Sequence, residues 1–153
     1  MRIGRRHCGA SLAAVLASGA LAAGCGGSDQ GSTAAKASDP DFAAKANAIC
    51  ERGDKRMQAA AGKYLGPGEP TRRQFKRFAT TAVVPYTQQI IDGIRSLTPP
   101  ASVSDTVDAM LAEAQSVTDR LTAAPETLAG SDDPFTKVNR LAKQAGLDAC
   151  AGD

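Results

Sequence analysis

Four segments of this sequence carry apolar or small residues at every third or fourth position, and clusters of proline and glycine separate the segments. Such spacing places these side chains along one face of an α-helix. The four stripes are Phe42, Ala46, Ile49, Gly53, Met57, Ala60 and Tyr64; Phe75, Phe78, Ala82, Tyr86, Ile90, Ile94 and Leu97; Val103, Val107, Met110, Ala114, Val117 and Leu121; and Phe135, Val138, Leu141 and Ala145. No segment alternates apolar and polar residues over a sustained run, so strands are not expected. The pattern predicts an all-α fold, an antiparallel four-helix bundle.

Local signals mark the ends of these helices. Asp39 is expected to cap the first helix, with Pro40 in its first turn. Thr71 and Gln74 fit a capping box for the second helix, and Pro85 should kink that helix because proline lacks an amide donor. The other expected boundaries are residues 65–70 (LGPGEP), residues 98–100 (TPP), Ser102, Pro125, and Asp132 or Asp133. Alanine fills many stripe positions, so the core is lean and each large side chain matters more.

The first 24 residues do not fit the helical domain. Three arginines precede Gly9, an apolar stretch runs over residues 10–23, and small residues follow. This layout is that of a secretory signal peptide. The apolar stretch has 14 residues, whereas a membrane-spanning helix needs about 20. The Arg5–Arg6 pair leaves the twin-arginine route open beside the general secretory route.

The residues LAAGC, from Leu21 to Cys25, resemble the lipobox of bacterial lipoproteins. The leucine stands four residues before the cysteine, one more than in the commonest pattern. The resemblance implies that Cys25 receives a diacylglyceryl group, that the signal is cut before it, and that the new N-terminus is acylated, with palmitate as the expected chain. Two or more chains make a stable anchor. The protein is then expected on the extracytoplasmic side of a bacterial cell membrane.

Residues 26–38 contain glycine, serine, alanine and polar residues without a large apolar side chain. Such a segment cannot bury enough surface to fold, and as a flexible coil it spans roughly 20 Å. The expected organisation is a signal peptide (1–24), a lipidated cysteine with a flexible tether (25–38) and a helical-bundle domain (39–153).

Removing the signal changes the charge balance of the chain. Of 18 Lys and Arg, three precede Cys25, which leaves 15 against 16 Asp and Glu. A nearly neutral domain lacks the clustered positive charge that nucleic-acid binding requires. The lone histidine, His7, also leaves with the signal, so Ser-His-Asp, Cys-His, zinc-protease and haem-attachment motifs are excluded from the mature chain. We expect no cofactor and no metal.

Cys50 and Cys150 remain once Cys8 is removed and Cys25 is lipidated. An exported chain permits oxidation, and two cysteines allow one intramolecular pairing. In an up-down-up-down bundle the short fourth helix ends at a height comparable to that of Cys50. The sequence therefore predicts a structural Cys50–Cys150 disulfide, the alternative being a redox-active pair.

Arg72, Arg73, Lys76 and Arg77 lie in the first two turns of the second helix, where the helix dipole disfavours cations. They fall opposite Phe75 and Phe78, on the solvent side. One interpretation is an ordinary solvated face balanced by acidic neighbours, for which the candidates are Glu51, Asp54 and Glu69. The other is a surface for an anionic envelope polymer, head group or acidic protein.

Two carboxylate pairs, Asp105 with Asp108 and Asp132 with Asp133, could serve acid–base work or hold a hard cation. Acidic residues are also favoured at helix starts, where both pairs lie. FAAKANAIC (42–50) and AGLDAC (145–150) resemble segments of small uncharacterised lipoproteins of high-GC bacteria, a resemblance that supplies no activity.

These observations favour a membrane-anchored envelope lipoprotein that works by binding or structural contact, and the sequence points to no enzymatic activity. Two alternatives stay open. The first is an extracytoplasmic hydrolase or transferase that uses carboxylates in a cleft between helices. The second is a small-ligand carrier, which would show an apolar cavity, opened by the kink at Pro85.

Overall fold

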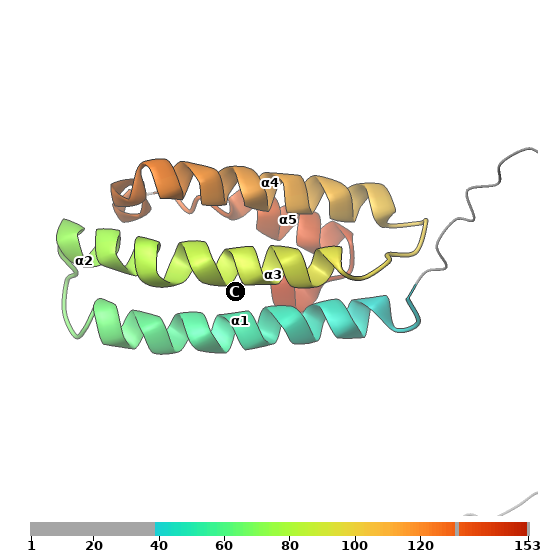
Figure 1. The fold of residues 1–153 in the computed structure, drawn as a ribbon, viewed down its shortest axis with the longest axis horizontal. Helices are drawn as coiled ribbons and strands as arrows, with labels where there is room; N and C mark the ends of the chain where they lie inside the picture. The colour runs from blue at the N-terminus through green and yellow to red at the C-terminus, as the bar shows by residue number, and fades with distance from the viewer. Residues whose placement is uncertain (1–38, 131, 153) are drawn as a thin grey trace, which may run out of the picture. The chain divides into compact units, whose positions relative to one another are not determined.

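A computed structural model describes residues 39–130 and 132–152 (Figure 1). All of them belong to one compact unit, Ala34–Asp153. Every regular element in these ranges is helical and none is a strand, as the apolar spacing predicts. The predicted signal peptide, the lipidation site Cys25 and the tether of residues 26–38 lie outside the described residues.

The first helix, α1, spans Phe42–Tyr64. The prediction that Asp39 caps it is wrong, because Asp41 occupies the N-cap with a φ of 58° and no side-chain cap bond forms. Asp39 instead pairs with the end of the next helix. Its amide donates to the carbonyl of Thr98 over 2.8 Å, and its carboxylate accepts from the Thr98 amide and from Lys45. The start of α1 is thereby tied to the loop 59 residues further along the chain.

One helical path follows, made of α2 (Arg72–Phe78), the π-helical segment η1 (Ala79–Val83) and α3 (Val84–Arg95). The predicted capping box is confirmed. The Gln74 amide donates to the Thr71 hydroxyl over 3.3 Å, and the Thr71 amide donates to Gln74 Oε1 over 2.9 Å. The path runs beside α1 in the opposite direction (Figure 1).

The distortion expected at Pro85 takes the form of the π-helical segment η1 directly before it. Pro85 cannot donate to the carbonyl four residues earlier, and wider turns shift the hydrogen-bond register, as when the amide of Val84 donates to the carbonyl of Ala79. The hydroxyls of Thr80 and Thr81 donate to the Arg77 carbonyl over 3.2 and 2.6 Å. The helix therefore continues through Pro85 by a shifted register, with two threonine hydroxyls on the Arg77 carbonyl at the start of the π-helical segment.

The third helix, α4, spans Ser104–Ala123. The region predicted as the fourth helix is shorter than expected, and another short helix precedes it. The 3-10 helix η2 (Pro125–Ala129) comes first, then α5 (Thr136–Gln144), and the 3-10 helix η3 (Asp148–Cys150) ends the described chain. Asp133 accepts a bond from the Phe135 amide over 2.9 Å instead of capping α5 directly.

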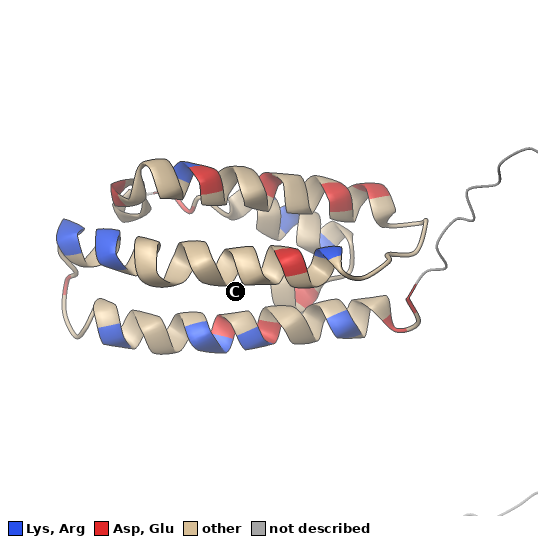
Figure 2. Ribbon diagram, in the orientation of Figure 1, with Lys and Arg blue, Asp and Glu red and all other residues tan. Residues whose placement is uncertain are grey.

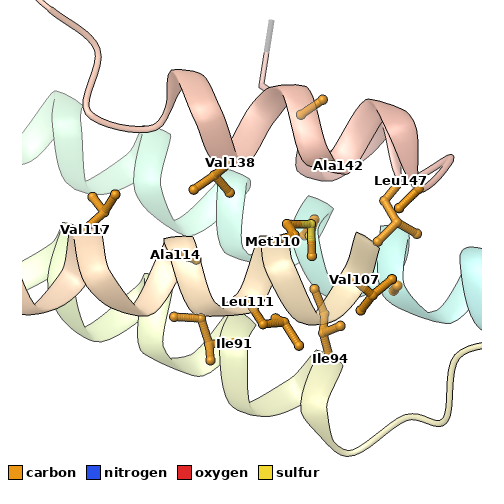
Figure 3. Close-up of a cluster of buried hydrophobic side chains, with 14 of the residues drawn as sticks. Ile91, Ile94, Val107, Met110, Leu111, Ala114, Val117, Val138, Ala142 and Leu147 are labelled. Atoms are coloured by element: carbon orange, nitrogen blue, oxygen red, sulfur yellow. The ribbon is translucent and has the colours of Figure 1, made fainter. Parts of the chain in front are cut away.

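The core lies between α3, α4 and α5 and extends to α1 (Figure 3). The largest fully buried side chains are Ile91, Ile94, Leu121, Leu147, Val107 and Val117, and four alanines, Ala46, Ala79, Ala82 and Ala142, are fully buried. The alanines and two glycines let helices approach closely. A methyl group added at Gly53 of α1 would lie 2.3 Å from Ile90 Cδ1 of α3. Within the described ranges, no helix is both long enough and apolar enough to span a bilayer.

Candidate functional site

An apolar groove of about 390 Å³ lies between α1, the η1–α3 segment and the chain that runs from η2 to η3. Its apolar walls include Met57 from α1, Val83 from η1, Ile90 from α3, Leu128 from η2 and Phe135 beside α5. Pockets that bind small molecules measure roughly 300–1,000 Å³ and have mainly apolar walls. The groove therefore has the size and character of a small-ligand site.

The groove lies where the chain after α4 forms two short helices, η2 and α5, instead of one long helix. A helix as long as α4 would cover α1 and α3 along their whole length, but η2 has 5 residues and α5 has 9. Residues 130 and 132–135 do not continue either helix. Val83 and Thr87, two residues to either side of Pro85, are among the lining residues, whereas Pro85 itself is not.

The groove contains one polar side chain in its buried part, Thr87, which is 9 % exposed. Its hydroxyl bonds to no residue that the structure describes. Within the same ranges, every side-chain oxygen or nitrogen sealed from solvent has a partner. The Thr87 hydroxyl is therefore open to the groove, where it can donate to or accept from a bound molecule.

Two carboxylates, Asp54 and Asp133, stand among the groove-lining residues, and none of the lining residues is Lys or Arg. Asp133 accepts bonds from the Phe135 amide and from Asn139 Nδ2. Asp54 is exposed and forms no ion pair with a described residue. Asp54 also lines a neighbouring hollow together with Glu51 and Asp148. This side of the groove mouth is acidic.

The Cys50–Cys150 disulfide forms part of the groove wall. The two sulfur atoms lie 2.05 Å apart, in the pairing that the sequence predicts, and join α1 to η3. A second bond holds the same segment, since the Ala149 amide donates to Asn47 Oδ1 over 3.1 Å. The position of this bond in the wall, and the absence of a CxxC spacing, fit a structural role.

A second candidate site is a cluster of cations where α1 ends and α2 begins, called the cationic end. It consists of Lys63, Arg72, Arg73, Lys76 and Arg77, all of them exposed. Figure 2 shows positive charge on α1 and α2, whereas α4 carries mostly acidic residues. None of the expected acidic neighbours, Glu51, Asp54 and Glu69, pairs with these cations within the described residues.

The aromatic ring of Tyr64 lies inside the cationic end. Lys63 Nζ is 5.3 Å from the ring centroid and the Arg77 guanidinium carbon is 5.4 Å from it. A hydrogen bond with Thr81, followed by the nearby charges of Lys63 and Arg77, lowers the pKa of the Tyr64 phenol. Sequence reasoning missed Lys63 and Tyr64. The short loop of residues 65–71 was the available signal, because it places the last turn of α1 beside the first turn of α2.

Of the two carboxylate pairs predicted from the sequence, neither lies as a pair at the groove or at the cationic end. Asp105 and Asp108 are exposed on α4, where Asp105 lies in the first turn. Asp132 is exposed, and Asp133 alone reaches the groove. No group of three or more metal-ligating side chains gathers among the described residues.

Comparison with protein-family models, with curated proteins and with solved structures found no match to this chain.

Proposed function

We propose that this protein is an exported lipoprotein of a bacterial envelope that acts by binding rather than by catalysis. In this proposal Cys25 carries a diacylglyceryl anchor in the cell membrane, residues 26–38 form the tether, and the helices form an antiparallel four-helix bundle outside the cytoplasm. The apolar stretch before Cys25 and the lipobox-like LAAGC sequence support the anchor. Neighbouring helices that run in opposite directions and are joined by short loops support the bundle.

The observation that carries the binding role is the cationic end. Five cations lie on one end of the domain without a carboxylate partner among the described residues. Charges of one sign that gather without local partners attract a partner of the opposite sign. Lys63 lies 21 residues after Phe42 in α1, which is about 32 Å along the helix. The cationic end therefore lies far along the domain from the residue where the tether enters, and an anionic envelope polymer or acidic protein is the proposed partner.

A second candidate function is that of a small-ligand carrier, and the apolar groove specifically favours it. The groove walls are mainly side chains without reactive groups, and one hydroxyl faces the interior. Such a surface can bind an apolar molecule, and the two carboxylates of its lining, Asp54 and Asp133, stand at exposed positions. The alternative of a hydrolase or transferase would rely on these two carboxylates, and Asp133 already accepts hydrogen bonds from the Phe135 amide and from Asn139.

Crosslinking in intact envelopes, followed by pull-down of the full-length chain, tests the main proposal. The variant reverses four charges: Arg72→Glu, Arg73→Glu, Lys76→Glu and Arg77→Glu. We expect it to recover about tenfold less of the crosslinked partner, because repulsion replaces attraction at the contact surface. The wild-type crosslink should also weaken as salt rises, since exposed charges are screened over about 8 Å at 0.15 M ionic strength.

The matched control reverses four exposed cations outside the cationic end: Arg52→Glu, Lys55→Glu, Arg140→Glu and Lys143→Glu. It changes the net charge by the same amount and should keep the partner. Identical partner sets for both variants would contradict the proposed surface.

A Cys25→Ala variant tests the anchor in the same preparation. This variant should leave the membrane fraction, and a full-length Cys25→Ala chain that still partitions with membranes would overturn the anchor.

A further inference from the structure

We infer that the groove is a binding site for a small amphiphile with an apolar tail and a positively charged head. This inference rests on the carrier function proposed above and names the class of molecule carried. Its elements are the apolar walls, the Thr87 hydroxyl in the buried part and the acidic mouth beside Asp54. They come from α1, α3 and the segment that begins at η2.

The walls select the tail of the ligand. Met57, Leu128 and Phe135 are only partly buried and pack against the core from the groove side. Covering such side chains with an apolar molecule removes their surface from water, which contributes about 25 cal/mol for each Å². An alkyl or flat apolar tail fits a groove with these walls.

The Thr87 hydroxyl indicates that the occupant is not a pure hydrocarbon. A hydroxyl in an apolar surrounding is costly unless it forms a hydrogen bond. Thr87 is nine-tenths buried and lacks a partner among the described residues, although other threonines of the same structure bond to the preceding helical turn, as Thr118 does to the Ala114 carbonyl over 2.8 Å. A polar group near the head of the ligand, or a water carried with it, would complete this bond.

The charge of the side chains at the groove mouth determines which ligand head group is favoured. Asp54 lines both the groove and the neighbouring hollow that Glu51 and Asp148 share. No Lys or Arg lines either space. Arg140 and Lys143 line a third hollow, which shares Asp133 with the groove. The charged residues that line this side are all carboxylates, so a cationic head is favoured there over an anionic one.

Calorimetric titration of the full-length, oxidised chain with decyltrimethylammonium tests the inference. Decyl sulfate has the same tail with the opposite charge, and tetramethylammonium has the head without the tail. We expect the decyltrimethylammonium ion to bind at one site at least about tenfold more tightly than decyl sulfate, or about 1.4 kcal/mol. Tetramethylammonium alone should give no measurable binding, because the tail supplies most of the buried surface.

Two tryptophan variants locate the site. Met57→Trp fills the groove from α1, and Gln58→Trp adds the same ring to the exposed side of the same helix. Binding of decyltrimethylammonium should weaken at least tenfold in the first variant and stay unchanged in the second. If Met57→Trp fails to fold by circular dichroism, Leu128→Trp replaces it. Asp54→Asn, at an exposed position, should reduce the preference for the cation severalfold while tail binding persists.

The outcomes separate the two levels of the proposal. If decyl sulfate binds as tightly as decyltrimethylammonium, and groove filling weakens both, the carrier function holds and the cationic class is wrong. If neither amphiphile binds, the carrier function and the ligand class fail together. The same holds if both amphiphiles bind a folded groove-filling variant as tightly as they bind the wild-type chain.

Discussion

Glu113 of α4 is the residue that links α4 to α5 by charge. Lys137 Nζ lies 2.7 Å from one carboxylate oxygen of Glu113, and Arg120 lies 3.9 Å from the other. The hydrogen bond from Lys137 is the main reason that the pKa of Glu113 is lowered, and the charges of Lys137 and Arg120 act in the same direction. The fold therefore favours the ionised carboxylate of Glu113.

This preference gives the stability of the protein a defined pH dependence. Because the pKa of Glu113 is lower in the folded chain than its ordinary value of 4.5, the pair stabilises the fold fully above that value and is lost as pH falls through the lowered pKa. We expect Glu113→Gln to lower the Tm slightly near pH 7 and to leave it unchanged at about pH 2. Thermal melting across this range measures the difference.

The control for the Glu113 effect is Glu126→Gln in η2. Glu126 is exposed and forms no ion pair within the described ranges, so its substitution should leave the Tm unchanged throughout. A deficit of Glu113→Gln that is the same at both ends of the pH range would show that lost packing, and not lost charge, explains it.

Residues differ in how well local rules predict them. Gln74 follows its rule, because a capping box involves only four neighbouring residues, and Gln74 Nε2 additionally donates to the Leu65 carbonyl. Asp39 departs from its rule, because its carboxylate bonds to Thr98 across 59 positions. That partner depends on how α1 and α3 pair, which no local pattern contains. Tyr64 lies between these cases, since the short loop was a signal that could have placed it beside α2, but no local rule gives its contacts with Lys63 and Arg77.

At the scale of elements, the apolar stripes predicted three of the helical regions to within a few residues. The fourth differs because a 3.6-residue period in apolar residues does not show where tertiary packing interrupts the helix. Pro125 marked a boundary, but the helix η2 that starts there was not predicted. Pro85 was predicted to kink its helix, and the structure has a π-helical segment, η1, directly before it. The π-helical form is a shift of the hydrogen-bond register by one residue, as the bond from the Val84 amide to the Ala79 carbonyl shows.

The contact between α1 and α3 depends on two glycines that meet isoleucines of the other helix. A methyl group at Gly53 would lie 2.3 Å from Ile90 Cδ1 and 2.7 Å from its Cγ1, and one at Gly93 would lie 3.1 Å from Ile49 Cγ2. Separations under 3.0 Å force a neighbour to move. Alanine at Gly53 would therefore fit only if the Ile90 side chain moved.

Substitution of Gly53 by alanine tests this close approach. In an open helical position Gly→Ala stabilises by up to about 1 kcal/mol, and overpacking costs typically about 1–3 kcal/mol. We expect Gly53→Ala to lower the free energy of unfolding by up to about 2 kcal/mol, the difference of these two effects. Gly62→Ala, in the same helix with nothing within 4 Å of the added methyl group, should raise it. Urea unfolding measures both, and equal gains in the two variants would contradict the close contact.

At the scale of the whole molecule, the sequence allowed an apolar cavity to be anticipated but not its size or its position. The sequence permits an apolar cavity beside Pro85, but its size follows from the lengths of η2 and α5 and from where the chain between them lies. The cationic end was predicted more completely, because four of its five residues belong to one helical segment. Sites built within one element can be predicted from periodicity, whereas sites between elements require the tertiary arrangement.

The disulfide is the contact that joins the two ends of the domain and closes the groove at η3. Cys50 and Cys150 are separated by 100 positions, and the core between them is rich in alanine. Closing such a loop restricts the unfolded chain, which contributes about 4–5 kcal/mol in the chain-entropy model and often less in practice. The η3 segment keeps one other bond to α1, through Asn47.

Reduction of the wild-type protein should therefore lower its free energy of unfolding by about 2–4 kcal/mol. It should also weaken ligand binding in the groove, because Ala149 and Cys150 of η3 form part of the groove wall. The Cys50→Ala/Cys150→Ala variant should match the reduced protein and show no response to reductant. Thermal melts of both proteins with and without reductant make the comparison. A wild-type Tm that does not change on complete reduction would mean that helix packing alone holds the lean core, and that the disulfide has a role other than stability.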